Sequence, residues 1–340
     1  MSAHKAWIAG CSAKRLTGDE KAFFRDERPW GFILFGRNVG EAGELRDLVA
    51  ELKEAGGRDS TPVFVDQEGG RVQRLRPPLA PSYPPSARLG AVYAADPEAG
   101  ERAAWLTGRL FAFDLAAYGF NADCLPCLDV PVVGASSVIG DRAYASAPDV
   151  VAKLGGAAAA GLAAGGLMPV MKHVPGHGRG NADSHLSLPV VDASCAELYA
   201  SDILPFQTLN HLPAAMTAHI LFSDIDAANP STLSPIVIED VIRNRIGFDG
   251  LLMTDDMSMK ALNGDMTDLS RRALDAGCDL ALHCNGDMAE MRKVAAGVTE
   301  LADKAKLRAE IAELYGPSRL HAADEAALRE EYARLMSAVA

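Results

Sequence analysis

We expect the 340-residue chain to form one (β/α)8 barrel of the TIM type, followed by a helical extension. Three observations lead to this fold class. Eight apolar, strand-like runs alternate with helical segments along the chain. Several of these runs are continuously apolar, which is typical of strands buried on both faces. Polar residues recur where the runs end, and the C-terminal strand ends of such a barrel are where catalytic groups lie.

The expected strands are, in chain order, Ala6–Ala9, Trp30–Phe35, Pro62–Asp66, Asn121–Val130, Leu167–Lys172, Ala214–Ile220, Gly250–Asp255 and Asp279–Cys284. The expected helices lie near residues 18–28, 41–55, 98–118, 148–164, 193–209, 235–246, 268–276 and 286–302. The helix after residue 234 has clear boundaries, because Ser234 can cap it, Pro235 suits its first turn and Gly247 can end it. We expect a single domain over residues 1–340, with the barrel at about 6–302 and charged helices over 303–340 outside it.

The composition narrows the possible partners. A net charge of −12 argues against nucleic acid or an anionic membrane surface. The uncharged stretch Leu154–Met171 is long enough to span a bilayer, but Gly165, Gly166 and Pro169 predict a buried helix followed by a buried strand instead. Six cysteines in a chain of this length do not indicate a disulfide framework. We therefore expect a cytoplasmic protein with no membrane span.

The segment KHVPGHGRGNADSHLSLP, residues 172–189, says most about function. It places three histidines and an aspartate in a loop rich in glycine and proline. Asp183 and His185 are two residues apart, so in an extended segment they lie on one side and can hydrogen-bond. The carboxylate favours a protonated imidazole, which makes His185 a competent proton donor near neutral pH. A loop histidine without a role is the simpler alternative.

Further candidate residues follow other strands. Asp255 and Asp256 come after GLLMT, and at most one of them points into the barrel mouth. Asp255 could act as a nucleophile or stabilise a cation, whereas a helix N-cap is the structural alternative. Asp66 and Arg74 in VDQEGGRVQR could bind sugar hydroxyls or an acetamido oxygen, or simply form a salt bridge. Arg142 in IGDRAY could bind a ligand or remain a solvated charge.

A metal site is the main chemical alternative for the loop. His173, His177 and His185 could join Asp183 as zinc ligands. Further ligands at the usual spacing on other strand ends are missing from the sequence. We therefore expect no metal and no cofactor.

Five separated motifs together resemble a known family. GFILFGRNV, VDQEGGRVQR, IGDRAY, KHVPGHG with ADSHLSLP, and LLMTDDMSM occur in this order between about residues 6 and 300. They resemble the family 3 glycoside hydrolases, and in particular the single-domain bacterial β-N-acetylhexosaminidases of peptidoglycan recycling. The resemblance implies a retaining exo-β-N-acetylglucosaminidase that acts on muropeptide fragments through a covalent glycosyl-aspartate. A β-glucosidase or β-xylosidase, a metal-dependent barrel hydrolase and a non-catalytic sugar-binding protein are the alternatives.

The resemblance also implies residue roles. Asp255 corresponds to the nucleophile, and His185 with Asp183 corresponds to the acid/base dyad. The positions that hold the N-acetylglucosamine ring correspond to Asp66, Arg74, Arg142, Lys172 and His173. The chain departs from the family pattern at residues 179–182, Arg-Gly-Asn-Ala, where Asp-Thr is common, and this puts the loop dynamics in doubt. Retaining hydrolysis needs a nucleophile and an acid on opposite sides of the sugar bond.

Overall fold

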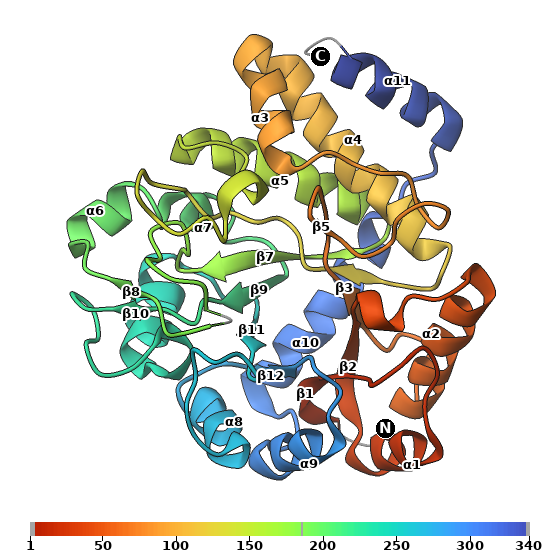
Figure 1. The fold of residues 1–340 in the computed structure, drawn as a ribbon, viewed down its shortest axis with the longest axis vertical. Coiled ribbons are helices and arrows are strands. Elements are labelled where there is room, and N and C mark those ends of the chain that lie inside the picture. Colours follow the sequence, from red (N-terminus) through yellow and green to blue (C-terminus); the bar gives the residue numbers. More distant parts are fainter. Residues whose placement is uncertain (1–3, 185, 338–340) are drawn as a thin grey trace.

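The computed structural model describes residues 4–184 and 186–337. Within these residues, eight parallel strands form one sheet in the order β3–β2–β1–β12–β11–β9–β7–β6 (Figure 1). The strands are β1 (Lys5–Gly10), β2 (Pro29–Leu34), β3 (Val63–Val65), β6 (Ala122–Asp123), β7 (Met168–Val174), β9 (Ala214–Thr217), β11 (Leu251–Asp256) and β12 (Leu280–His283).

The two outer strands of the sheet, β3 and β6, meet and nearly close it into a barrel. The backbone N–H of Cys124 donates to the Val65 carbonyl at 2.9 Å. The Asn121 side chain accepts a hydrogen bond from the Val63 N–H at 2.7 Å. The predicted (β/α)8 barrel is therefore confirmed, and each of the eight expected strands has a counterpart in it.

Most of the expected helices surround the barrel. They are α1 (Gly18–Glu27), α2 (Ala42–Gly56), α4 (Pro97–Ala116), α5 (Pro148–Ala164), α8 (Met266–Asp275) and α9 (Met288–Gly297). The segment near 235–246 forms a π-helix, Val237–Arg245, rather than an α-helix. Its N-terminus is capped as predicted, because Ser234 Oγ accepts from the Val237 N–H at 3.1 Å. Gly247 follows it with a φ of 74°, a left-handed conformation that favours glycine.

Three details differ from the predicted elements. Helix α3 (Ser86–Ala95) was not expected. The helix expected over 193–209 is divided into α6 (Cys195–Ala200) and α7 (Leu204–Thr208), because Ser201 leaves the helical conformation and Pro205 fits only the first turn of a new helix. The strand expected over 121–130 is interrupted: β6 covers only Ala122–Asp123, Pro126 has no amide hydrogen for the ladder, and pairing with β7 resumes in a bridge between Cys127 and Lys172.

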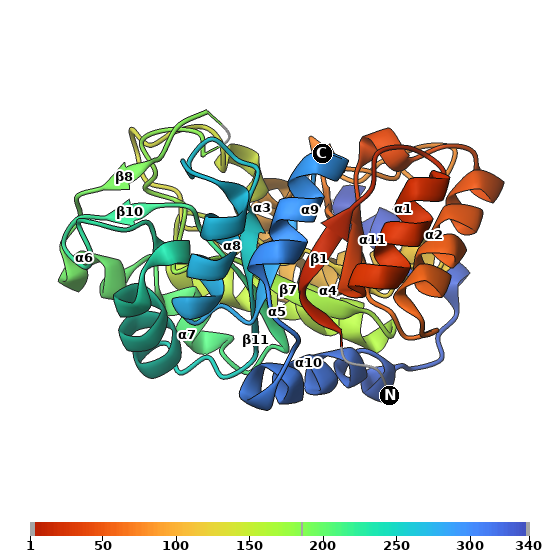
Figure 2. The same cartoon turned by 90° about the horizontal axis from the view of Figure 1, so that it is seen from below.

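Helices α10 (Asp303–Tyr315) and α11 (Glu325–Ser337) follow the barrel. Helix α10 crosses the N-terminal end of the strands (Figure 2). Its Ala309 and Ala312 belong to the same buried apolar cluster as barrel-interior side chains such as Ile8 and Val170. Helix α11 packs on α4, where Arg329 pairs with the buried Asp114 at 2.5 Å. The first of the two C-terminal helices thus closes one end of the barrel.

Two small sheets lie at the C-terminal ends of the barrel strands. The antiparallel pair β4 (Gln67–Gly69) and β5 (Val72–Gln73) follows β3 directly. The pair β8 (Val190–Val191) and β10 (Leu221–Phe222) follows β7 and β9. These segments form part of the rim through which the barrel opens.

Among the described residues, no helix has both the length and the apolar character needed to cross a membrane. The uncharged stretch 154–171 instead forms the second part of α5, a glycine turn and the start of β7, as predicted. All six cysteines are free, and Cys124 and Cys127 are buried, as expected.

Candidate active site

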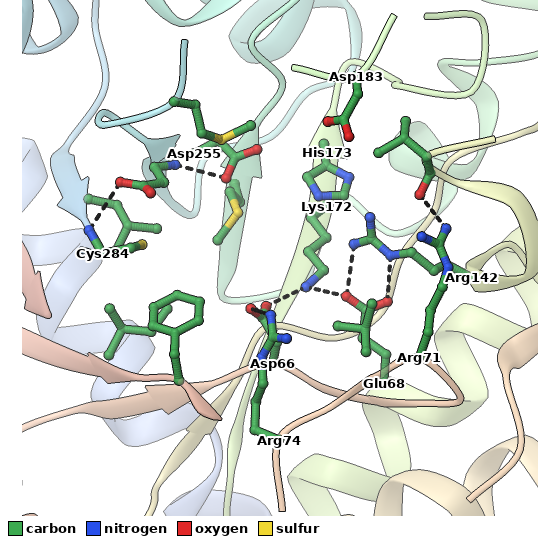
Figure 3. A pocket seen from close by; sticks show the side chains of 18 residues that line it. Asp66, Glu68, Arg71, Arg74, Arg142, Lys172, His173, Asp183, Asp255 and Cys284 are labelled. Carbon is green, nitrogen blue, oxygen red and sulfur yellow. Dashed lines mark hydrogen bonds and ion pairs between the residues drawn. The ribbon is translucent and has the colours of Figure 1, made fainter. Parts of the chain in front are cut away.

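A cavity of about 310 Å³ opens at the C-terminal ends of the barrel strands (Figure 3). It is lined by every described residue to which the family resemblance assigned a role: Asp66, Arg74, Arg142, Lys172, His173, Asp183 and Asp255. These residues come from four separate regions of the sequence and meet only because the barrel brings the strand ends together. His177, a candidate metal ligand, is not among the lining residues. His185 lies outside the described residues, so the structure locates only its predicted partner, Asp183.

One wall of the cavity carries a continuous row of charges (Figure 3). Lys172, at the end of β7, contacts Asp66 Oδ1 at 2.7 Å and Glu68 Oε1 at 2.6 Å through its Nζ. Asp66 Oδ2 accepts from Arg74 Nη2 at 2.9 Å. Glu68 holds Arg142 through two hydrogen bonds of 2.8 Å each. The row Arg74–Asp66–Lys172–Glu68–Arg142 therefore alternates in sign and has one positive charge in excess.

The row keeps its members ionised although they are buried. Burial raises the pKa of Glu68, but Arg142 and Lys172 outweigh it and bring the pKa to about 2. Burial likewise opposes ionisation of Asp66, and Lys172 and Arg74 hold the pKa of that carboxyl well below its usual range. Burial alone would lower the pKa of Lys172, whereas the two carboxylates raise it above its ordinary value. Such a charged cluster is stable only while every member keeps its partners.

Asp255 lies at the end of β11 and lines the cavity apart from the charged row. Its Oδ1 accepts a hydrogen bond from the Asp256 N–H at 2.8 Å. Burial raises its pKa, but His173 and the Asp256 amide are among the groups that lower it below the usual value overall. Asp255 is therefore a carboxylate at neutral pH.

The neighbouring acid, Asp256, has a different role. Its carboxylate accepts hydrogen bonds from the Cys284 N–H at 3.0 Å and from the Ser258 hydroxyl at 2.7 Å. It therefore connects β11 to β12 and to the loop that follows β11. Asp256 also lines the cavity, but both of its carboxylate oxygens are engaged in these hydrogen bonds.

His173 is oriented by a buried carboxylate. Its Nδ1 lies 2.6 Å from Asp129 Oδ2, and a carboxylate can only accept, so Nδ1 carries the hydrogen. Asp129 Oδ1 also accepts from the His177 N–H at 2.6 Å. Burial raises the pKa of Asp129, but His173 and its hydrogen bond to that ring lower it below the ordinary value. The arrangement fixes the ring of His173 at the cavity wall.

The loop after β7 brings Asp183 to the cavity, whereas Asp255 reaches it from β11 (Figure 3). Ser184, next to Asp183, is buried, and its carbonyl accepts from the Ala261 N–H at 3.1 Å. The Ser184 hydroxyl lies 3.3 Å from His177 Nε2. The loop is thereby connected to the segment that follows the strand of Asp255.

The described residues contain one group that could share a metal ion, namely Cys127, Asp129 and His173. Of the residues that the sequence analysis considered as alternative zinc ligands, only His173 belongs to this group. Asp129 already accepts hydrogen bonds from both of its possible co-ligands, at 3.2 Å from Cys127 and 2.6 Å from His173. The donors are therefore arranged as a hydrogen-bonded cluster that orients His173.

Sequence reasoning assigned no role to Glu68, although a signal for it was available. Asp66 and Glu68 are two residues apart in an extended segment, so their side chains lie on the same side. No role was predicted for Asp129 either, which lies near the end of the expected strand Asn121–Val130. Its pairing with His173 depends on two strands that are adjacent in space, β6 and β7.

Residues 13–313 match the family model described as glycosyl hydrolase family 3 N terminal domain. A β-hexosaminidase from Methylococcus capsulatus is 41% identical over 275 residues, which cover 80% of each chain. A β-hexosaminidase from Thiobacillus denitrificans is 35% identical over 333 residues, or 96% of this chain and 90% of the relative.

The solved structures agree with this result. Native NagZ from Neisseria gonorrhoeae superposes with a TM-score of 0.86 at 32% identity and covers 98% of both chains. The complex of NagZ from the same organism with N-trifluoroacetyl-D-glucosamine gives the same TM-score at 31% identity, over 99% of both chains. This chain therefore belongs to glycosyl hydrolase family 3 and is a glycoside hydrolase.

Proposed function

We propose that the protein is a retaining exo-β-N-acetylglucosaminidase that removes terminal N-acetylglucosamine from muropeptide fragments of peptidoglycan in the cytoplasm. The observation that carries the proposal is the ionised, half-buried Asp255 in a cavity that Asp183 enters from another element. A cavity of about 310 Å³ is at the small end of the range for ligand sites and suits a single terminal sugar.

The charged row suits the binding of a sugar ring. Carboxylates accept hydrogen bonds from hydroxyl groups, and Lys and Arg donate to their oxygens. We assign the ring hydroxyls to Asp66, Arg74, Lys172 and His173. Arg142, at the other end of the row, can donate to the acetamido oxygen. The β-hexosaminidase relatives and the NagZ complex with N-trifluoroacetyl-D-glucosamine support an N-acetylated amino sugar as the substrate.

In the proposed reaction, Asp255 attacks the anomeric carbon while the glycosidic C–O bond breaks. His185, oriented and kept protonated by Asp183, donates its proton to the departing oxygen. In the second step, His185 takes a proton from water, which attacks the anomeric carbon and releases Asp255. Two inversions give a product with the original β configuration.

The activity is tested by comparing an aryl β-N-acetylglucosaminide with the matching aryl β-glucoside. We expect a strong preference for the N-acetyl sugar, a β-configured first product by NMR, and a trapped fluorosugar ester on Asp255 by mass spectrometry. Preference for the glucoside or xyloside would support the other family activities. Loss of activity on chelation, restored by zinc, would support the metal-dependent alternative.

A further inference from the structure

His219 is a fully buried histidine at the end of β9, close to the candidate nucleophile but without a role in the proposed reaction. We infer that His219 is a positioning residue, which fixes the direction of the Asp255 carboxylate through the backbone of Asp256. The inference rests on the proposed role of Asp255. Three observations carry it: the hydrogen bonds of the imidazole, the immobilisation of Asp256, and the contact of Asp256 with Asp255.

The hydrogen bonds of the imidazole have a defined direction. His219 Nε2 lies 3.0 Å from the Asp256 carbonyl, which can only accept, so Nε2 carries a hydrogen. Burial lowers the pKa of His219, so the ring is neutral near pH 7 and its Nδ1 is an acceptor. The hydroxyl of Thr232 has two acceptors within reach, Nδ1 at 2.7 Å and the Ala218 carbonyl at 3.1 Å, and the shorter contact is the donated hydrogen bond because the neutral ring has no hydrogen on Nδ1.

The row of donors continues one step further into the barrel wall. The hydroxyls of Thr217 and Thr232 are 2.7 Å apart. Because the Thr232 hydrogen is directed at the imidazole, Thr217 donates to Thr232. The resulting chain runs from Thr217 through Thr232 and His219 to the Asp256 carbonyl, and both threonines are fully buried. The orientation of the ring is therefore set from both of its nitrogen atoms.

Asp256 is held at each of its polar groups. His219 binds its carbonyl, and the amides of Cys284 and Ser258 donate to its Oδ1 at 3.0 Å each. Its own N–H donates to Asp255 Oδ1 at 2.8 Å. The residue is thus fixed between β9 and β12, and this fixed N–H sets the direction of the Asp255 carboxylate.

The consequence for catalysis follows from the geometry of attack. A nucleophile that is misplaced by about 1 Å can lose on the order of 100-fold in rate. Replacing His219 by a group that cannot donate would remove the tie between this peptide and the end of β9. The Asp256 carbonyl would keep only the Met259 N–H at 3.0 Å, a partner within its own loop. The effect should fall on kcat, because the side chains assigned to the sugar ring remain in place.

The test compares His219→Leu, which removes both hydrogen bonds, with His219→Gln, whose amide can donate to Asp256 and accept from Thr232. With an aryl β-N-acetylglucosaminide, we expect His219→Leu to lower kcat by about 10- to 100-fold with KM nearly unchanged. His219→Gln should recover most of the loss. His211→Leu, at an exposed histidine remote from the cavity, is the matched control.

The Asp255→Gly variant distinguishes a positioning role of His219 from a general loss of structure. In Asp255→Gly, azide can replace the missing carboxylate as the nucleophile. A terminal nitrogen of azide bonds to the anomeric carbon as the aryloxide leaves, which gives the α-glycosyl azide. If His219 acts through Asp255, adding His219→Leu to Asp255→Gly should leave the azide-dependent rate within about twofold, as expected for a single shared interaction. An equal loss in both backgrounds would overturn the inference.

Two further outcomes are distinguishable. If Asp255→Gly retains full activity without azide, the proposed nucleophile is wrong, and the inference fails with it. If His219→Leu does not fold, Thr232→Val tests the same chain while keeping the imidazole, and we expect kcat to fall by about 3- to 10-fold, the loss of one buried hydrogen bond. An unchanged kcat in Thr232→Val would overturn the inference.

Discussion

Buried carboxylates that stay ionised define the site at the level of single residues. Glu68 shows the principle best, because its side chain is only 1% exposed and is enclosed by Arg142 and Lys172. Two cations on one carboxylate outweigh its desolvation, and the same contacts hold the cations in place. Removing the charge of Glu68 therefore affects groups that bind the sugar in the proposed reaction.

Glu68→Gln keeps the shape of the side chain and removes its charge. We expect kcat/KM for the aryl β-N-acetylglucosaminide to fall by at least about 100-fold, since breaking a buried ion pair costs about 3–5 kcal/mol. Glu98→Gln, at an exposed position on α4, should leave kcat/KM unchanged. Wild-type kinetics in Glu68→Gln would show that the charged row is not needed for catalysis.

The pH dependence of stability offers a separate measurement on Glu68. Its pKa in the folded protein is about 2, against an ordinary value of 4.5. A lowered pKa gives stability that is present above pH 4.5 and is lost as the pH falls toward 2. Urea titrations over this range should give a shallower decline for Glu68→Gln than for the wild type. Parallel curves would contradict the assignment of an ionised Glu68.

His185→Ala tests the proposed proton donor. Without the imidazole, substrates with poor leaving groups need a proton that is no longer supplied, whereas activated aryl glycosides do not. We expect a far larger loss of kcat/KM for a disaccharide substrate than for a nitrophenyl glycoside. Equal losses on both substrates would show that His185 is not the acid.

The sequence predicted seven residues that meet at one cavity, and it missed the residues that hold them. Asp66, Lys172 and Asp255 stand out because each follows an apolar run. Asp129 acts on His173, which is 44 residues away in the sequence, and Glu68 acts on Arg142, which is 74 residues away. The first pairing depends on the segment after β6 lying beside β7, and the second on the loop that carries Arg142 reaching β4. No local sequence pattern contains either arrangement.

At the level of elements, the loop after β7 is anchored by one carboxylate from the segment after β6. Asp129 accepts hydrogen bonds from the backbone of His173 at 3.3 Å and of His177 at 2.6 Å, as well as from the His173 ring. A second contact joins Arg179 of this loop to the buried Asp202 at 2.7 Å. The departure from the family pattern at residues 179–182 thus includes a residue that anchors the loop.

Asp129→Asn replaces one acceptor oxygen with a donor. The His173 ring or the loop amides then lose a partner, which costs about 1–3 kcal/mol for a buried group. We therefore expect kcat/KM to fall by about 10- to 100-fold. Asp26→Asn, on the exposed side of α1, is the control. Unchanged kinetics would mean that His173 keeps its orientation without Asp129.

Element types were predictable where local signals were strong. The eight strands followed from their apolar runs, and the boundaries of the helix after Ser234 followed from Ser234, Pro235 and Gly247. The π-helix over Val237–Arg245 did not, because a shift of one residue in its hydrogen bonding leaves the apolar pattern nearly unchanged. Helix α3 was not predicted, although Pro85 directly precedes it and a proline is compatible with the start of a helix.

At the scale of the whole molecule, the C-terminal helices stabilise the barrel from outside the cavity. Arg329 of α11 donates to Asp114 at 2.5 Å and to the Tyr83 hydroxyl at 3.0 Å. Asp114 is buried on α4, so α11 neutralises a charge within the main helical layer. This contact joins the end of the chain to its first half.

Arg329→Leu would leave Asp114 without its cation. We expect the melting temperature to fall by several degrees, about 2–4 °C for each kcal/mol lost in a protein of this size. The kcat at 25 °C should be unchanged, because α11 contributes no residue to the cavity. Arg334→Leu, on an exposed face of the same helix, should change neither quantity. A loss of kcat without a change in melting temperature would contradict a purely stabilising role.

Ala309 and Ala312 of α10, with Leu301 just before the helix, close the far end of the barrel, so the cavity is accessible from one side only. The incoming glycan and the released sugar must therefore pass through the same opening, at the C-terminal ends of the barrel strands. In the proposed reaction the aglycone departs first, and the monosaccharide held deepest leaves last. Free N-acetylglucosamine that re-enters the cavity then occupies the position of the terminal sugar of the next substrate, so turnover slows as this product accumulates.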